Sequence, residues 1–439
     1  MVVMRDKLLI TSALPYANGS IHLGHLVEYI QTDIIVRFLK LIGKDVIYIC
    51  ASDTHGTPIE VNAAKLGMKP EALVKKFNKE HKRDFEKFFV QFDHFYTTHS
   101  KENKELSEHF FTTLKKNGYI YTKKINVIFC EHCARVLPDR YVRGTCPHCA
   151  TLDQYGDVCE SCGVALKGID LIDPKCSICG TTPIQKESEH YFFKLSSFSG
   201  KLKKWLDGNK NLQPEFKNHI GDWLKKGLED WNISRDGPYF GFKIPGEKKK
   251  YFYVWLDAPI GYISATKHYT KKWSNYWKHG EIVHFIGKDI IYFHFLFWPA
   301  MLMGTGFALP SDIVVHGLPT VNGEKMSKSR GTFFTAQDFL KLYPPEFLRF
   351  YYAQHLSKKL ADVDLDFENF KASINNNLIA NVANFCYRVL SFAEKNYGKL
   401  DEIADDAVVK EIRKKVENVQ QKYHAYDIKG AMEEILSMS

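Results

Sequence analysis

The sequence predicts an α/β protein whose parallel, nucleotide-binding type of sheet is interrupted by a cysteine-rich insert and followed by helices. Three observations support this prediction. The chain opens with a strand, a helix and a second strand; it carries four Cys-x-x-Cys pairs between residues 130 and 179; and it shows amphipathic helical spacing from about Pro345 onward.

The opening segment is typical of a parallel βαβ unit. Strands are expected at residues 7–12 and 46–50, joined by a turn at residues 15–19 and a helix from His22 to about Leu41. Residues 70–117 are expected to be mostly helical, because their apolar side chains recur at helical spacing. Further strands are expected at residues 251–255, 282–286 and 313–315, so the insert divides one sheet.

Composition and charge limit the class of protein. The 439 residues are 45% hydrophobic and 14% aromatic, which is a globular composition, and this length predicts roughly two to four domains. No run of about 18 uncharged apolar residues and no signal peptide is present, so we expect a soluble cytoplasmic protein without a membrane partner. The net charge of +9 fits a polyanionic partner, although a solvated surface explains any single lysine run. The composition leaves the oligomeric state open.

Two histidines, His22 and His25, stand three residues apart at the start of the first helix, so their side chains share one face. Residues 18–20 just upstream supply a turn and a helix cap. A helix N-terminus favours an anion, and imidazole N–H groups can add donors to phosphate oxygens. Core packing and metal binding are the alternatives, but a metal site needs another ligand and the His-Glu-x-x-His pattern is absent.

A basic loop follows the expected strand at residues 313–315. Its sequence, Gly-Glu-Lys-Met-Ser-Lys-Ser-Arg-Gly at residues 323–331, places Lys325 and Lys328 between glycines, where they can close over a triphosphate. A plain surface loop is the alternative for any lysine-rich stretch.

Eight of the ten cysteines form the Cys-x-x-Cys pairs, which supply two complete Cys₄ zinc sites. All four ligands of each ion would come from the protein, so both sites are expected to be structural. Spacing does not fix which pairs share an ion, and a redox role is the alternative. The ligands expected are Cys130, Cys133, Cys146, Cys149, Cys159, Cys162, Cys176 and Cys179.

Together, residues 20–25 (Ser-Ile-His-Leu-Gly-His) and 325–329 (Lys-Met-Ser-Lys-Ser) resemble the two signatures of class I aminoacyl-tRNA synthetases. The absence of Gly-x-Gly-x-x-Gly is consistent with ATP rather than a dinucleotide. Further segments are similar to methionyl-tRNA synthetases in particular, and the resemblance covers nearly the whole chain. These segments are residues 13–19, 53–58, 253–262 and 287–289.

This resemblance implies a Rossmann-like catalytic domain split by a zinc-binding connective insert, then a stem-contact region and a partial helical anticodon-binding domain. The implied ranges are 1–117 and 239–318 for the catalytic halves, 118–238 for the insert, 319–375 for the stem-contact region and 376–439 for the helical domain. The zinc pairing implied is nested, with the middle two Cys pairs on one ion and the outer two on another.

The resemblance also implies a methionine–tRNA ligase reaction, in which methionine and ATP with Mg²⁺ give methionyl-adenylate and pyrophosphate before transfer of methionine to its tRNA. The phosphate-binding, catalytic residues implied are His22, His25, Lys325 and Lys328, with Asp289 on the ribose of ATP. The anticodon residues implied are Asn384 and Arg388, although two such residues one helical turn apart can equally face solvent. Because the family uses a later tryptophan against the anticodon, we expect a C-terminal truncation and weak tRNA charging.

For methionine, the resemblance implies a pocket whose apolar members would otherwise be assigned to the core. Asp53 would hold the ammonium with Arg235 as a nearby charge partner, an internal ion pair being the alternative for Arg235. Tyr262 and His294 would offer hydrogen bonds to sulfur, and homocysteine is expected to be rejected imperfectly because one methylene contributes only about 1–3 kcal/mol. The whole set is Leu14, Asp53, Trp255, Ala258, Tyr262, Ile290, Phe293, His294 and Phe297.

Overall fold

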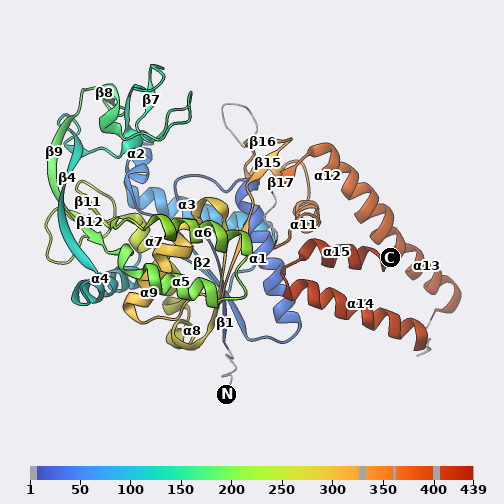
Figure 1. The fold of residues 1–439 in the computed structure, drawn as a ribbon. Helices are drawn as coiled ribbons and strands as arrows, with labels where there is room; N and C mark the ends of the chain where they lie inside the picture. The colour runs from blue at the N-terminus through green and yellow to red at the C-terminus, as the bar shows by residue number, and fades with distance from the viewer. Residues whose placement is uncertain (1–6, 326–332, 359–361, 399–405, 439) are drawn as a thin grey trace.

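The computed structural model describes residues 7–325, 333–358, 362–398 and 406–438. Its centre is a five-stranded parallel sheet (Figure 1). From edge to edge the strands are β14 (Asp312–His316), β13 (Glu281–Gly287), β1 (Leu8–Ser12), β2 (Val46–Ser52) and β3 (His94–Thr97). Because β1 pairs with β13, strands from both sides of the insert form one sheet, which confirms the expected split α/β fold.

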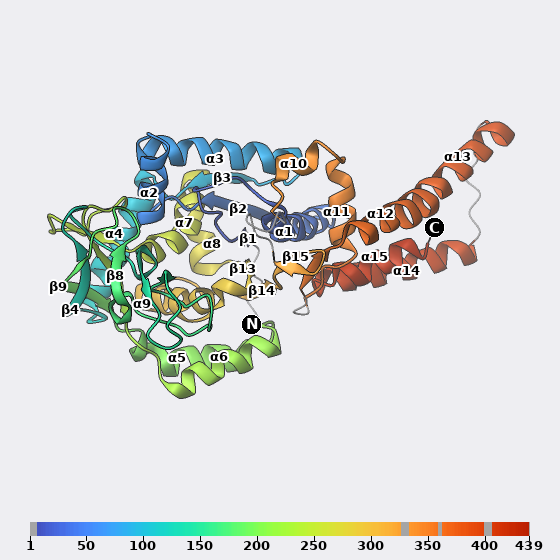
Figure 2. The same ribbon diagram turned by 90° about the horizontal axis from the view of Figure 1, so that it is seen from above.

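Helices pack on both faces of this sheet because its strands are apolar on both sides. Along β1, Leu9 faces one layer and its neighbour Ile10 faces the other, as alternation along a strand requires. The first layer contains α4 (Lys101–Lys116), α7 (Val254–Tyr269), α8 (Trp273–His279) and α9 (Trp298–Thr305), and the second contains α1 (Leu23–Leu41). Two further helices, α2 (Thr57–Lys65) and α3 (Pro70–Lys87), pack together beside them (Figure 2).

The stretch at residues 70–117 is helical as expected, with one exception. The edge strand β3 separates α3 from α4. A four-residue strand is too short to interrupt the helical spacing visibly in the sequence.

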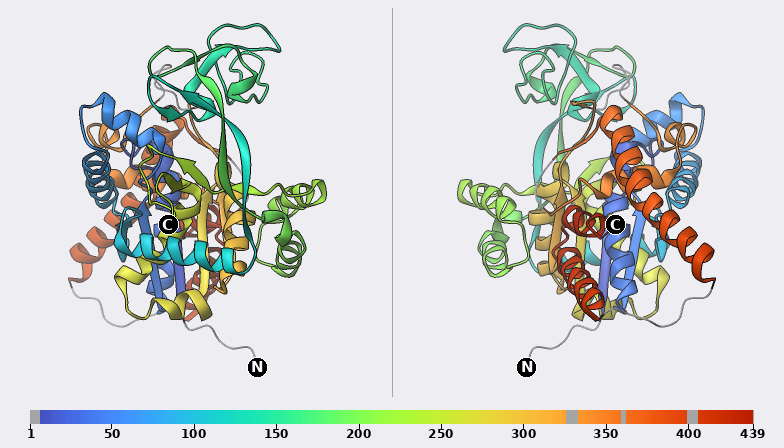
Figure 3. Two further views of the ribbon diagram at one scale, coloured as in Figure 1. Left: turned by 90° about the vertical axis from the view of Figure 1, so that its left-hand side faces the viewer. Right: turned by 90° about the vertical axis from the view of Figure 1, so that its right-hand side faces the viewer.

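The insert is built on a long antiparallel hairpin of β4 (Ile120–Cys130) and β9 (Ile184–Phe193). The cysteine loops lie at its far end, as Figures 1 and 3 show. There the short elements are β5 (Arg135–Val136), η1 (Asp139–Tyr141), β6 (Val142–Thr145), β7 (Gln154–Tyr155), η2 (Gly168–Asp170) and β8 (Ile172–Cys176). After β9, the chain continues through the elements η3 (Leu195–Phe198), α5 (Ser199–Gly208), α6 (Pro214–Lys226), β10 (Trp231–Asn232), β11 (Ser234–Asp236) and β12 (Lys250–Phe252).

After the sheet, the chain forms a small three-stranded sheet and then helices. The sheet contains β15 (Pro319–Val321), β16 (Glu324–Lys325) and β17 (Val363–Leu365). The helices are α10 (Ala336–Leu340), α11 (Pro345–Ala353), α12 (Phe367–Ser373), the π-helix η6 (Ile374–Ala383), α13 (Asn384–Tyr397), α14 (Asp406–His424) and α15 (Ile428–Leu436). The helical character expected after Pro345 is therefore confirmed, although the division of the chain into domains stays a prediction.

The C-terminal helices return to the sheet. The segment from α12 to α13 leads away from the sheet and α14 leads back (Figure 1). Tyr423 stacks on Phe38 of α1, and the ring of Tyr426 meets Phe285 of β13 edge-on. Within the described residues, no helix combines the length and the apolar character needed to cross a membrane.

Candidate active site and metal centres

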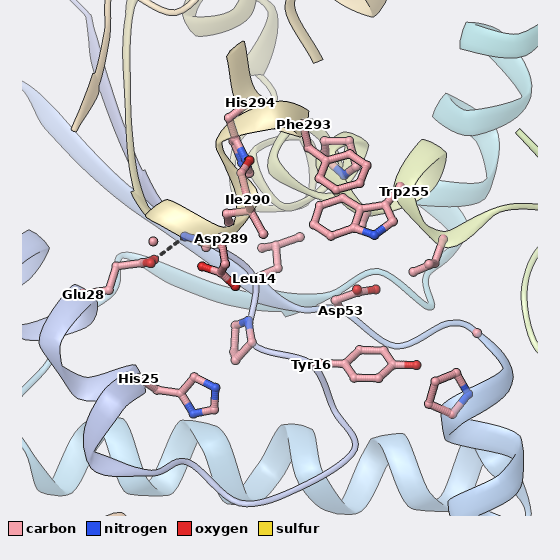
Figure 4. Close-up of a pocket in the computed structure, with 18 of the residues that line it drawn as sticks. Leu14, Tyr16, His25, Glu28, Asp53, Trp255, Asp289, Ile290, Phe293 and His294 are labelled. Atoms are coloured by element: carbon pink, nitrogen blue, oxygen red, sulfur yellow. Dashed lines mark hydrogen bonds between the residues drawn. The ribbon is translucent and has the colours of Figure 1, made fainter. Parts of the chain in front are cut away.

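A cavity of about 750 Å³ opens at the carboxyl ends of β1, β2 and β13. Crevices at this edge of a parallel sheet are the usual ligand sites of α/β folds. Figure 4 shows side chains from the turn after β1, from α1, from the end of β2 and from α7 converging on it. Further lining comes from the two short helices that follow β13, η4 (Lys288–Ile290) and the π-helix η5 (Phe293–Phe297).

The two histidines cap α1 and each other. His22 is the N-cap residue, and its Nδ1 accepts a hydrogen bond from the His25 N–H at 3.3 Å; the His25 Nδ1 accepts from the His22 N–H at 3.3 Å. Since each Nδ1 is an acceptor, the hydrogen of each neutral ring lies on Nε2. Burial first, and then His22 and His81, lower the pKa of His25 well below its ordinary value. A neutral ring at a helix N-terminus can therefore present an N–H donor to an anion.

The expected lysine loop joins two segments that border this site. Pro319 of β15 lines the cavity, and β16 ends at Lys325; Lys328 lies outside the described residues. Beyond the loop, Phe333 also lines the cavity, and its ring lies 5.2 Å from that of His22. The described segments on either side of the lysine loop thus lie at the same cavity as His22 and His25.

Asp53 directly follows β2 and is fixed through its backbone. Its N–H donates to the Pro15 carbonyl at 2.9 Å, and its carbonyl accepts from the Ala17 N–H at 2.7 Å. Its Oδ1 is buried and has no hydrogen-bond partner among the described residues. Burial, followed by the charge of Asp257, raises the pKa of Asp53 well above its usual range. A ligand ammonium would supply the partner that this buried oxygen lacks.

Arg235 lines the same cavity but is engaged elsewhere. Its guanidinium lies 3.6 Å from the ring centroid of Tyr253, and Nη1 donates to the Ser234 carbonyl at 2.7 Å. In the part of the chain that the structure describes, Arg235 forms no ion pair, either with Asp53 or internally. Arg235 was expected to lie near Asp53, and the structure places both residues in the lining of the same cavity.

Eight of the nine residues expected in the methionine pocket line the cavity, and two of them form a stacked aromatic wall. Trp255 and Phe293 stack face to face with centroids 3.5 Å apart. Phe297 is the exception, because it does not line the cavity and is fully buried behind Phe293. The expected residues that do line it are Leu14, Asp53, Trp255, Ala258, Tyr262, Ile290, Phe293 and His294.

The hydrogens of Tyr262 and His294 are already used. His294 Nδ1 lies 3.2 Å from the Ile290 carbonyl, which can only accept, so Nδ1 carries the ring hydrogen. Burial lowers the pKa of His294 to about 4, leaving Nε2 as an acceptor for the Tyr262 hydroxyl at 2.9 Å. In this arrangement neither side chain offers a hydrogen to a sulfur, contrary to the expectation.

Asp289, expected at the ribose, lines the cavity beside two residues that sequence reasoning missed. Glu28 accepts from the Ala13 N–H at 2.5 Å, and its second oxygen lies 3.3 Å from His316 Nε2. Burial lowers the pKa of His316, but the hydrogen bond and charge of Glu28 outweigh it and raise the pKa overall. The sequence could have indicated Glu28 as a site residue, because it follows His22 and His25 at three-residue steps along one helical face.

The eight paired cysteines gather into two groups, each with its four Sγ atoms within 4.8 Å of one another. Tetrahedral zinc with Zn–S bonds of about 2.3 Å needs Sγ atoms about 3.8 Å apart. Sγ–Sγ distances of 3.5 and 3.9 Å in one group and 3.6 and 3.9 Å in the other fit this geometry. The groups are Cys130, Cys133, Cys176 and Cys179, and Cys146, Cys149, Cys159 and Cys162, which is the nested grouping.

Each Cys-x-x-Cys loop has the same local shape. The residue after the second cysteine has positive φ in all four: Ala134, Ala150, Gly163 and Gly180. In two loops a backbone N–H points at the first thiol of the pair, from Cys133 to Cys130 at 3.4 Å and from Cys162 to Cys159 at 3.5 Å. Such donors stabilise thiolates, so the donor chemistry fits a bound metal ion.

The insert also touches the cavity, which the sequence did not indicate. Pro138, Arg140 and Tyr141 line it from the cysteine-bearing end of the hairpin. A partly buried ion pair of Arg135 with Glu60 of α2, at 3.1 Å, ties this end to the catalytic side. By contrast, Asn384 and Arg388 lie on α13, where both are exposed and away from the cavity lining.

Comparison with known proteins identifies the family. The family model described as "tRNA synthetases class I (M)" matches residues 8–390. A protein of Leptospira biflexa serovar Patoc named methionine–tRNA ligase is 49% identical over 443 residues, covering 99% of this chain and 65% of its own length. The chain thus spans about two thirds of the curated relatives that it matches.

Solved structures agree with this match. Mycobacterium tuberculosis methionyl-tRNA synthetase in complex with methionyl-adenylate is 27% identical, with a TM-score of 0.81 over 98% of this chain and 82% of that chain. The apo form of the M. tuberculosis protein, 24% identical, shares the fold with a TM-score of 0.72 over 100% of this chain and 80% of that chain. The chain therefore belongs to the class I tRNA synthetases of this methionyl family.

Proposed function

We propose that this chain is a methionine–tRNA ligase, which activates L-methionine with ATP and transfers it to the 3′ end of its tRNA. One observation carries the proposal. The cavity joins the donor-bearing end of α1 to Asp53, whose buried Oδ1 has no hydrogen-bond partner among the described residues, and to the stacked rings of Trp255 and Phe293. The Leptospira relative's name and the methionyl-adenylate bound to the M. tuberculosis protein support the same activity.

In the first step a methionine carboxylate oxygen attacks the α-phosphorus of ATP, the bond to the β-phosphate oxygen breaks, and pyrophosphate leaves. The reaction needs no covalent enzyme intermediate, so catalysis rests on position and charge. His22 and His25 present Nε2 donors where negative charge develops, and Lys325 and Lys328 are proposed to add charge from the loop. Mg²⁺ bound with ATP would neutralise part of the phosphate charge.

Selection of methionine is assigned to the aromatic wall. A thioether sulfur beside Trp255, Phe293 and Tyr262 gains about 0.3–1.5 kcal/mol per ring contact. Because Tyr262 donates its hydroxyl hydrogen to His294, that hydrogen is not available to a sulfur, so recognition is assigned to shape and polarisability. A shape-based pocket rejects homocysteine imperfectly.

The two Cys₄ groups are proposed to hold one Zn²⁺ each. All ligands are thiolates of the protein, so each ion would stabilise the insert instead of activating water. The proposed tRNA contacts are the region from β15 to α12 for the acceptor stem and Asn384 and Arg388 on α13 for the anticodon. Asp289 is proposed for the ribose of ATP.

The test is ATP–pyrophosphate exchange over a panel of the amino acids used by class I synthetases. We expect exchange with methionine, weaker exchange with homocysteine and none with leucine, isoleucine or valine. Exchange with another amino acid but not with methionine would overturn the assignment and point to a different class I synthetase. Nucleotide binding without any exchange would indicate a catalytically inactive RNA-binding protein.

A further inference from the structure

Three hydrogen-bonded side chains form a network that interacts electrostatically with Asp53. Asp257, in the first turn of α7, has its Oδ2 2.5 Å from Nδ1 of His55, and Nε2 of His55 lies 3.0 Å from Nδ1 of His99. The side chains of Asp257 and His55 are fully buried, whereas His99 reaches the surface. Phe240 and Phe242 pack against both imidazole rings, so the inner part of this hydrogen-bonded network is shielded from solvent.

Asp53 and Asp257 therefore interact electrostatically, and His55 is hydrogen-bonded to the carboxyl of Asp257. Asp53 Oδ1 and Asp257 Oδ1 are both buried without a hydrogen-bond partner among the described residues. Like charges in a dry site oppose each other's ionisation. The charge of Asp257 is, after burial, the largest cause that raises the pKa of Asp53.

The other charged or titratable groups around this network do not replace His55. Arg235 lies over Tyr253, and the hydroxyls of Tyr16, Tyr239, Tyr253 and Tyr262 have pKa values that burial raises, so they stay neutral. On the outer side, the carboxylate of Glu71 interacts electrostatically with His99. Among these described neighbours, His55 alone is hydrogen-bonded to the Asp257 carboxyl.

We propose that the His55–Asp257 pair holds one proton in addition to the ring hydrogen of neutral His55, and that this extra proton exchanges with solvent through His99. The pair then presents no net charge to Asp53, so Asp53 stays ionised to receive the substrate ammonium. The inference rests on the proposed function, since it assumes that methionine binds with its ammonium on Asp53. His55 and Asp257 are positioning residues in this scheme, because they act through Asp53.

The decisive variant is His55→Asn. The asparagine amide can still donate to Asp257 Oδ2 but cannot hold an extra proton, so Asp257 becomes an uncompensated charge. We expect the acid limb of kcat/KM for methionine, measured by ATP–pyrophosphate exchange, to move up by about one pH unit. At a pH on that limb the KM for methionine should rise about tenfold, while the KM for ATP and kcat at saturating methionine change little.

The double variant His55→Asn with Asp257→Asn separates charge from packing. Removing the second carboxylate takes away the repulsion, so the acid limb should return to that of the unsubstituted protein. Asp257→Asn alone should leave the limb in place or move it to lower pH. His109→Asn, at an exposed histidine of α4, is the matched control and should leave the profile unchanged.

Several outcomes overturn the inference. One is a double variant whose acid limb stays displaced, or whose activity falls below that of His55→Asn. Another is an unshifted limb in His55→Asn. If His55→Asn does not fold, an upward shift of the limb in Asp257→Asn is sufficient to reject the scheme, and an unchanged or lower limb supports it. Failure of the unsubstituted protein to catalyse methionine-dependent exchange instead refutes the proposed function.

Discussion

His22 and His25 serve the helix and the ligand with different nitrogens. Each Nδ1 caps a backbone N–H of the other residue, which fixes the rings in a stack with centroids 3.6 Å apart. The sequence predicted that these side chains share a face, because three-residue spacing does so on any helix. It could not predict the tautomer, which depends on His22 being the N-cap residue.

The separate roles of the two nitrogens lead to opposite expectations for two substitutions of His25. His25→Asn keeps an acceptor near Nδ1 but removes the Nε2 donor, so we expect adenylate formation to slow about 10²–10³-fold with little change in Tm. His25→Gln keeps a donor near Nε2 and should retain more activity while weakening the cap by about 1 kcal/mol. Single-turnover adenylate formation and thermal unfolding measure the two effects. Equal rates for both variants would refute the division of roles.

The buried neutral His294 makes stability depend on pH. Its pKa is about 4 in the folded protein and about 6.5 when unfolded, so below pH 6.5 the unfolded chain binds the extra proton. The free energy of unfolding should therefore fall by about 2 kcal/mol from this residue between pH 7 and pH 5. In His294→Gln, whose amide oxygen can still accept from Tyr262, urea unfolding should show that much less loss over the same range. Parallel curves for the two proteins would contradict the assignment.

At the scale of elements, α7 and the turn after β1 are in close contact at Gly261. A Cβ there would lie 2.9 Å from Leu14 Cδ1 and 2.8 Å from Thr98 Cγ2. Leu14 lines the cavity, so Gly261→Ala should push it inward and raise the KM for methionine about tenfold, or about 1.4 kcal/mol, with a smaller effect on ATP. Gly221→Ala in α6, where a Cβ meets nothing within 4 Å, is the control. Exchange kinetics that change equally in both variants would show that the effect is not local.

We expect the cysteine-bearing end of the insert to depend on bound metal ions for its core. Nine buried residues form that core, and four of them are cysteines: Cys130, Cys146, Cys159 and Cys176. We expect about two zinc ions per chain by elemental analysis, from eight thiolates at four per ion. Chelation should expose the insert to proteolysis between β4 and β9 while the parallel sheet stays protected. Cys386→Ser, at an exposed thiol of α13, should keep both ions, and a metal-free protein with a resistant insert would contradict the prediction.

At the level of single elements, the sequence predicted those strands and helices that are long enough to show a hydrophobic period. The strand–helix–strand opening and the split sheet follow from apolar runs and turn residues, and the cysteine pairs follow from spacing. The strand expected at residues 251–255 is the three-residue β12, which ends at Phe252 because α7 begins at Val254, and it pairs antiparallel with β11 outside the parallel sheet, contrary to the expectation. The strands β10 and β11 have only two and three residues, so no periodicity could reveal them. The family resemblance implied that Phe297 belongs to the pocket, yet within η5 Phe293 and His294 line the cavity and Phe297 is buried in the core.

Across the whole molecule, contacts between distant segments bring the chain that follows the lysine loop to the histidine motif. His22 forms an isolated bridge with Thr335, and the Leu23 N–H donates to the Phe334 carbonyl at 3.1 Å. These contacts fix the segment after the lysine loop against the start of α1. They join residues more than three hundred positions apart, and no local pattern encodes such a pairing, which is why only the family resemblance suggested it.

A buried carboxylate holds the same two regions together further along α1. Asp33 is fully buried and accepts from Arg349 of α11 at 2.6 Å, from Arg37 at 2.7 Å and from the Gln91 N–H at 2.8 Å. Removing one partner from such a network leaves the others unpaired in a dry environment. Asp33→Asn should therefore lower the free energy of unfolding by about 3 kcal/mol, because the largely buried guanidinium of Arg349 and the more exposed one of Arg37 lose their counter-charge. Asp207→Asn, in the exposed Lys203–Asp207 pair of α5, should change it by less than about 0.5 kcal/mol. Urea unfolding of both variants is the measurement, and equal losses would show that α1 and the C-terminal helices are held together by apolar packing alone.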